Sequence, residues 1–188
     1  TGADLTFSST YGYWGIIILY NWQKIFSGDS FFYDYPLGRA HYGDLGYMKI
    51  ARVIYDDIHA LKSFGVNGYM SCQELRAMSP TGFPDYVMAQ ALTDESIPYE
   101  TLRDTYFSAM FGPGWEDAAA FLERLSSLSD TDYWNNHGPR CQPFLADRYR
   151  RMALLAEDFR TQIPLAQKEI WRKNWEYLDF HCRYTMLL

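Results

Sequence analysis

The chain has 188 residues, of which 48% are hydrophobic and 21% are charged, and this composition excludes a disordered, collagenous or coiled-coil protein. The net charge of −6 provides no basic surface for nucleic acid. The longest apolar stretch, residues 11–20, is far shorter than the about 18 residues that cross a bilayer, so we expect no membrane span.

Residues 1–97 predict a partial α/β barrel segment, and residues 98–188 predict a helical bundle extension. In the first portion, residues 13–26 favour a helix. The aromatic run Ser30–Tyr35, which ends before Pro36, is typical of a buried strand.

A long amphipathic helix is predicted from Asp44 to Phe64. Its apolar stripe consists of Tyr47, Ile50, Ala51, Ile54, Ile58 and Leu61. The opposite face carries Lys49, Arg52, Asp56, Asp57 and Lys62. Gly65 is placed to end the helix in a left-handed conformation, and the short strand Gly68–Ser71 follows. This order predicts that Phe31–Tyr35 and Gly68–Ser71 are parallel and joined by a right-handed crossover.

The second half of the chain is dominated by helical patterns. Helices are predicted over residues 85–92, 98–111, 115–128, 144–163 and 165–184, the last two separated or kinked at Pro164. Two parallel strands alone do not form a stable sheet, so we expect neighbouring strands from another chain or from an earlier part of a larger barrel. An open sheet edge also predicts self-association.

Polar side chains follow both predicted strands, where ligands bind in parallel α/β folds. Asp34 and Glu74 each follow one strand. Because glycoside hydrolysis uses a pair of carboxyl groups, these two are the candidate catalytic residues. The candidate substrate-binding residues on the same strands and loops are Tyr33, Tyr35, Arg39, His41, Tyr42, Ser71, Gln73 and Arg76.

Structural roles compete with each of these assignments. Asp34 could pair with Arg39 and Glu74 with Arg76, or either carboxylate could bind sugar hydroxyls without acid–base chemistry. His41 is more often a hydrogen-bonded loop histidine than a base. The aromatic content of 18% suits sugar stacking, but aromatic side chains also fill cores, so it does not decide between the two.

Other chemical signatures are absent from the sequence. It contains no GxSxG, GxxxxGK[ST], GxGxxG or HExxH motif, and we expect neither a cofactor nor a structural metal. The three cysteines, Cys72, Cys141 and Cys182, match no metal spacing and predict reduced thiols in a cytoplasmic protein. No signal-like segment opens the chain, although a start at Thr1 leaves an upstream signal open.

Four segments between Gly28 and Gly112 carry a family resemblance. They read FFYDY, LKSFGVNGYMSCQE, PTGFPDYVMAQAL and YETLRDTYFSAMFG in chain order. In this order they resemble the later barrel segment of a bacterial family of large glycoside-hydrolase-like proteins, a domain of unknown function related in architecture to α-glucuronidases and β-N-acetylhexosaminidases. The resemblance implies the C-terminal part of a (β/α)₈-like barrel followed by a helical extension. It also implies that Asp34, Tyr35 and Glu74 lie at the rim of a carbohydrate cleft, with the principal acid and base in the earlier barrel portion.

Three functional hypotheses follow. The first is a fragment of a glycoside hydrolase that contributes substrate-cleft residues and is inactive alone. The second is a module that binds carbohydrate without cleaving it. The third is a helical interaction domain that docks a protein partner through Trp115, Trp171 and Trp175.

Overall fold

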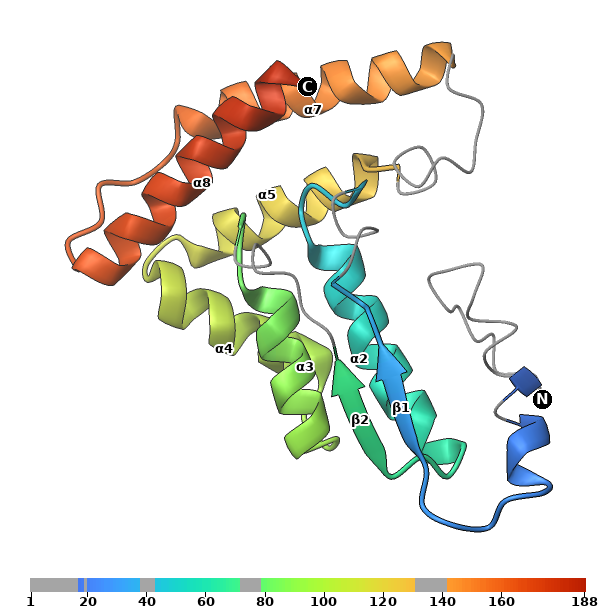
Figure 1. The fold of residues 1–188 in the computed structure, drawn as a ribbon. Helices are drawn as coiled ribbons and strands as arrows, with labels where there is room; N and C mark the ends of the chain where they lie inside the picture. Colours follow the sequence, from blue (N-terminus) through green and yellow to red (C-terminus); the bar gives the residue numbers. More distant parts are fainter. Residues whose placement is uncertain (1–16, 19, 38–42, 72–78, 131–141) are drawn as a thin grey trace.

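The computed structural model describes residues 17, 18, 20–37, 43–71, 79–130 and 142–188 (Figure 1). In chain order the elements are β1 (Phe31–Asp34), α2 (Met48–Ser63), β2 (Gly68–Ser71), α3 (Phe83–Thr93), α4 (Tyr99–Phe111), α5 (Trp115–Leu128), α7 (Pro143–Arg160) and α8 (Glu169–Leu187). Residues 17, 18 and 20–23, within the expected first helix, are helical. The described part of the chain is therefore mostly helical, with one strand–helix–strand unit ahead of a run of helices.

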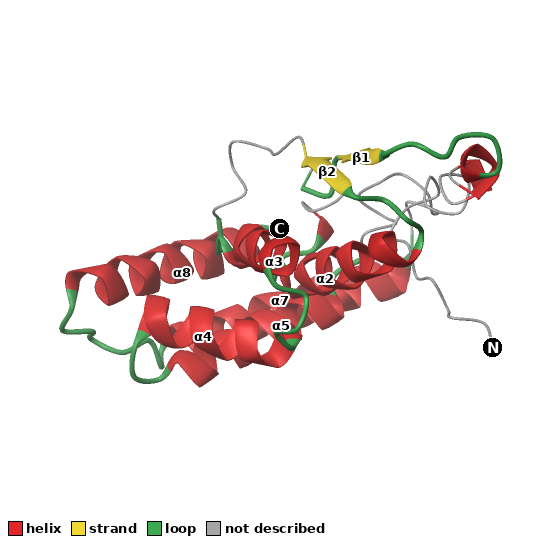
Figure 2. Cartoon of the chain, turned by 90° about the horizontal axis from the view of Figure 1, so that it is seen from below, coloured by secondary structure: helices red, strands yellow, loops and turns green. Residues whose placement is uncertain are grey.

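The two strands pair in parallel, as the sequence predicts. Phe31 lies opposite Gly68 and Asp34 opposite Ser71. The strand arrows point the same way in Figure 1, and in Figure 2 α2 and α3 lie on one side of them. In the described residues the sheet has two strands, and no described helix covers its other face.

Both ends of α2 are set by local backbone geometry. The helix begins four residues later than predicted, because Tyr47 takes a left-handed conformation with φ 61° and only Met48 starts the regular turns. At the other end Gly65 has φ 67°, and its N–H donates to the Lys62 carbonyl at 3.0 Å. This confirms the predicted role of Gly65, since a side chain would strain that conformation.

The later helices agree with the predicted pattern apart from their bounds. α4 and α5 meet at Gly112 and Gly114, both at positive φ. α7 ends at Arg160, and α8 starts at Glu169, so the segment around Pro164 is not helical. Proline lacks the N–H that would continue the helical ladder, which accounts for a break here. None of the described helices is both long and apolar enough to cross a membrane.

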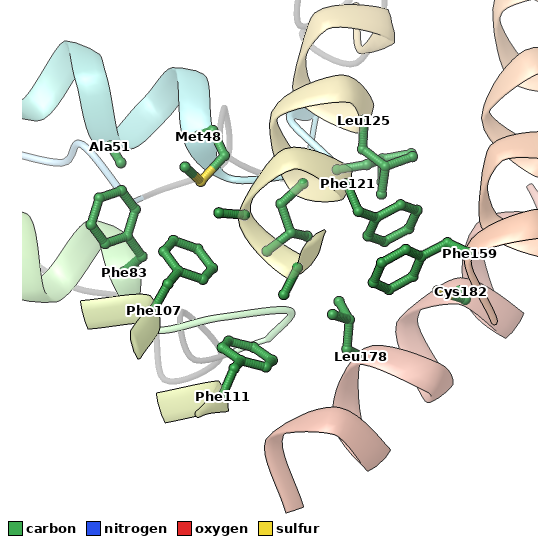
Figure 3. Close-up of a cluster of buried hydrophobic side chains, with 14 of the residues drawn as sticks. Met48, Ala51, Phe83, Phe107, Phe111, Phe121, Leu125, Phe159, Leu178 and Cys182 are labelled. Carbon is green, nitrogen blue, oxygen red and sulfur yellow. The ribbon is translucent and has the colours of Figure 1, made fainter. Parts of the chain in front are cut away.

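One hydrophobic core joins the strand–helix–strand unit to the later helices (Figure 3). Met48 of α2 and Phe83 of α3 belong to the same buried cluster as residues of α4, α5, α7 and α8. In that cluster the rings of Phe121 and Phe159 stack with their centroids 4.0 Å apart. The change in pattern near residue 98 is thus a change in secondary structure, and apolar side chains from both sides of it share one core.

A buried polar junction fastens the start of α2 to α5. The Asp44 carboxylate accepts the hydroxyl of Ser126 and the Ile50 N–H, the latter at 3.0 Å. Ser126 Oγ in turn accepts the Met48 N–H at 2.9 Å. Gly46 fits because a Cβ there would lie 1.9 Å from the Leu122 carbonyl oxygen. The junction therefore satisfies backbone donors at the helix start with Asp44, just ahead of the helix, and with Ser126 from a distant helix.

Substitution of Ser126 should expose how much this junction contributes to stability. Ser126→Ala removes the hydroxyl donor to a buried carboxylate and the acceptor for the Met48 N–H, and we expect it to lower the free energy of unfolding by about 2 kcal/mol. The matched control is Ser127→Ala on the exposed side of α5. This variant should change the free energy of unfolding by less than about 0.5 kcal/mol. Urea unfolding followed by circular dichroism measures both, and equal effects would contradict the assignment.

Candidate functional site

Strand alternation sorts the side chains of β1 and β2 onto two faces. On one face Phe32 pairs with Tyr69 and Asp34 pairs with Ser71. All four side chains are half-buried. Tyr69 packs against a core cluster from α2 and α3, so this face is turned toward the helices. The opposite face is exposed and carries Phe31, Tyr33 and Met70, with Tyr35 following just past the strand end.

Asp34, a predicted catalytic residue, is held at the carboxyl end of β1. Its Oδ1 accepts the backbone N–H of Tyr35 at 2.7 Å, and its Oδ2 accepts the Tyr69 hydroxyl at 3.2 Å. Both carboxylate oxygens are thus engaged within the chain. The side chain belongs to the helix-facing set, on the other side of the sheet from the exposed tyrosines.

Asp34 belongs to a partly buried cluster with Asp57, Tyr69 and Ser71, which we name the Asp34 cluster. Burial, and next the charge of Asp34, raise the pKa of the Tyr69 phenol, so Tyr69 stays a protonated donor. Burial raises the pKa of Asp57 to about 7, helped by the charges of Asp34 and Asp56. The Ser71 hydroxyl is buried near the Tyr69 phenol. The cluster can therefore hold or release one proton near neutral pH.

Asp57 is the member of this cluster that the sequence analysis placed wrongly. We expected it on the solvated face of the helix, yet it is half-buried beside Asp34. The signal was present in the spacing, since Asp57 follows Ile50 by seven residues and Ile54 by three, which places all three on one stripe. Because aspartate is charged and charged residues are mostly exposed, we assigned Asp57 to the solvated face.

The exposed face supplies aromatic rings. Tyr33 is 47% and Tyr35 57% exposed, and their rings meet edge to face with centroids 4.9 Å apart. Two exposed rings at the end of a strand offer apolar surface together with phenolic hydroxyls. This combination suits a ligand that has both C–H faces and hydroxyl groups.

The remaining predicted site residues, Arg39, His41, Tyr42, Gln73, Glu74 and Arg76, lie outside the described residues, so a carboxylate pair of Asp34 and Glu74 stays a prediction. Among the described residues no group of three His, Cys, Asp or Glu side chains could hold a metal ion. A cavity of about 510 Å³ lies beside the start of β2, and its lining includes the ion-paired Lys62 and Glu95. It is at the opposite end of the strand from Ser71.

Comparison of the chain with models of known families, with curated proteins and with solved structures found no match.

The pKa of Asp57 predicts a specific pH dependence of stability. Its carboxyl group titrates near 4 when unfolded and near 7 when folded, so the folded state binds the extra proton between these values. Stability from this group is present below about pH 4 and is lost as the pH rises through about 7. Relative to Asp57→Asn, the wild type should lose about 1–2 kcal/mol of unfolding free energy between pH 4.5 and 8, allowing for partial solvent screening.

Urea unfolding at several pH values measures this difference. Asp56→Asn is the matched control, because Asp56 is exposed, forms an ion pair with Arg52 and is the smallest of the causes that raise the pKa of Asp57. This control should retain most of the wild-type pH dependence. Parallel curves for the wild type and Asp57→Asn would show that Asp57 titrates normally.

Proposed function

We propose that this chain contributes substrate-cleft residues to a glycoside hydrolase-like protein that acts on a carbohydrate. The observation that carries the proposal is the parallel pairing of β1 and β2, which brings Asp34 and Ser71 to one end of the sheet. Tyr33 and Tyr35 are exposed at the same end. In parallel α/β folds this end is where ligands bind.

The one-sided covering of the sheet supports a barrel as the complete architecture. Parallel sheets are normally buried on both faces, whereas here the described helices cover one face and Phe31, Tyr33 and Met70 are exposed on the other. Additional strands that curve around this face would enclose it, with α2 and α3 in the outer helical layer. Tyr35, just past the strand, would then lie at the mouth of the barrel.

Within this proposal the residues have distinct roles. Tyr33 and Tyr35 stack against the C–H faces of sugar rings. Asp34 is a positioning residue, because one of its oxygens holds the Tyr35 N–H and the other holds the Tyr69 hydroxyl. Glu74, Arg39 and His41 are the candidates for contact with the glycosidic bond and the sugar hydroxyls.

Carbohydrate binding without cleavage is the second candidate function. It is favoured by the position of Asp34, whose carboxylate is engaged on the helix-facing side and would have to leave both partners to reach a sugar on the open face. A general acid or nucleophile has to reach the reacting atoms. On this hypothesis the tyrosines bind a sugar and no carboxylate of the chain protonates it.

Substitution of Tyr35 tests the proposed contact with sugar. Calorimetric titration of the protein with oligosaccharides should give an affinity that Tyr35→Ala weakens about tenfold or more, because a stacking ring is lost. Tyr20→Ala, at an equally exposed tyrosine outside the proposed site, is the matched control and should bind as the wild type does. Equal affinities for all three proteins would exclude a Tyr35 contact.

Hydrolysis separates the two candidate functions. With aryl-glycosides as substrates, a glycoside hydrolase should lose about 10²-fold or more of its kcat on Glu74→Gln if Glu74 is the acid or base. Asp34→Asn should raise KM more than it lowers kcat, since Asp34 orients Tyr35. Sugar binding with no turnover by the full-length protein that contains this chain would support the binding module instead.

A further inference from the structure

A second apolar stripe runs along α8, on the side away from the core. The core side of the helix buries Trp175, Leu178 and Cys182. The stripe on the other side consists of exposed Ile170, Tyr177, Phe180, Tyr184 and Leu187. Tyr177 is 64% and Phe180 66% exposed, so most of each ring contacts solvent.

The spacing of this stripe indicates what it binds. Its members follow one another at intervals of seven, three, four and three residues, and Lys173 occupies the position midway between the first two. This is the repeat of 3.5 residues that packs one helix along another. A surface helix normally needs only its core-facing stripe, so a second one marks an interaction surface for a helix.

The tryptophans that the sequence suggested as docking residues do not form this surface. Trp175 is 2% exposed, and its indole N–H donates to the Phe111 carbonyl at 3.0 Å. The Trp171 indole N–H donates to the Ala109 carbonyl at 3.0 Å, and its ring packs against Gly112. Both anchor α8 to the end of α4; the burial of Trp175 leaves it no surface for a partner, and docking by Trp171 stays a prediction.

We propose that two copies of this chain associate through α8, with the two helices antiparallel and the stripes in contact. In this arrangement Tyr177 packs against Phe180 of the other copy, and Ile170 packs against Leu187. Lys173 lies over the ring of Tyr184, a favourable cation–π contact. The pairing repeats by symmetry, as a twofold interface requires.

Charges beside the stripe favour the antiparallel arrangement. Glu176 and Arg183 lie seven residues apart on the same flank and are 65% and 61% exposed, although each also has a partner within α8, Arg172 at 3.8 Å and Asp179 at 2.7 Å. Antiparallel pairing places Glu176 of each copy near Arg183 of the other, which gives two attractive contacts. Parallel pairing would place Lys173 opposite the same lysine of the other copy.

The size of the stripe is sufficient for a dimer. The exposed parts of three aromatic and two aliphatic side chains amount to about 500 Å² per copy, or about 1,000 Å² in total, which reaches the lower limit of specific interfaces. α8 has 19 residues and is therefore about 28 Å long, enough for several successive layers of contacts.

The association constant of the 188-residue chain, measured by sedimentation equilibrium, tests the proposal. The wild type should dimerise, and Phe180→Lys should weaken the dimer about tenfold or more. Leu154→Lys changes an equally exposed leucine on α7 and should leave the dimer unchanged. Circular dichroism checks that each variant is folded. A wild type that is monomeric throughout, or a dimer unaffected by Phe180→Lys, would overturn the proposal.

Exchange of the charges at Glu176 and Arg183 tests whether the partner is a second copy of the chain and whether the two helices are antiparallel. Glu176→Arg alone and Arg183→Glu alone should each weaken the homodimer, because like charges then face each other. When the two single variants are mixed, both contacts in the heterodimer become attractive again, so the mixture should associate as tightly as the wild type. The double variant Glu176→Arg/Arg183→Glu should also recover. A mixture no tighter than the separate single variants would exclude antiparallel pairing.

Discussion

The rest of the structure depends on the buried polar junction at the start of α2. Asp44 and Ser126 satisfy the N–H groups of Ile50 and Met48, and Ser129 Oγ accepts the Leu45 N–H at 3.0 Å. Backbone donors at a helix start have no partners within the helix, and leaving them unsatisfied in a core is costly. Asp44 precedes α2, but Ser126 belongs to α5 and Ser129 caps its end, so the start of α2 is completed only when α5 is in place. The strand–helix–strand unit and the helices are therefore coupled.

This coupling also positions the candidate site. Leu37, three residues past the end of β1, is fully buried, and Asp44 is buried in the junction. α2 carries Asp57 about two and a half turns beyond its start, where its carboxyl group feels the charge of Asp34. The proton that the Asp34 cluster can hold thus depends on how α2 is seated, and a change in that seating would alter the charge at the end of the sheet.

The aromatic surplus divides between two uses that composition cannot separate. Four buried rings form a chain of contacts through the core, in the order Phe83, Phe107, Phe111 and Trp175. Tyr33 and Tyr35 are exposed at the end of a strand, and Tyr177, Phe180 and Tyr184 are exposed along α8. The buried rings stabilise the fold by packing in the core. The exposed rings add little to the stability of the core, so their presence points to binding.

The sequence by itself determined the elements whose signals are local. The apolar period predicted α2, and Gly65 predicted its end. The strand–helix–strand order predicted parallel pairing of β1 and β2. These signals can be found in short stretches of sequence because backbone sterics and crossover handedness are properties of the local chain. The sequence could nominate Asp34 as a site residue, but not which side of the sheet it would face. Only the tertiary structure decided that Asp34 is tied to Tyr69, that Asp57 is drawn inward and that α8 keeps a second apolar face. Each of these depends on contacts between residues far apart in the chain, whose burial and register no local pattern specifies.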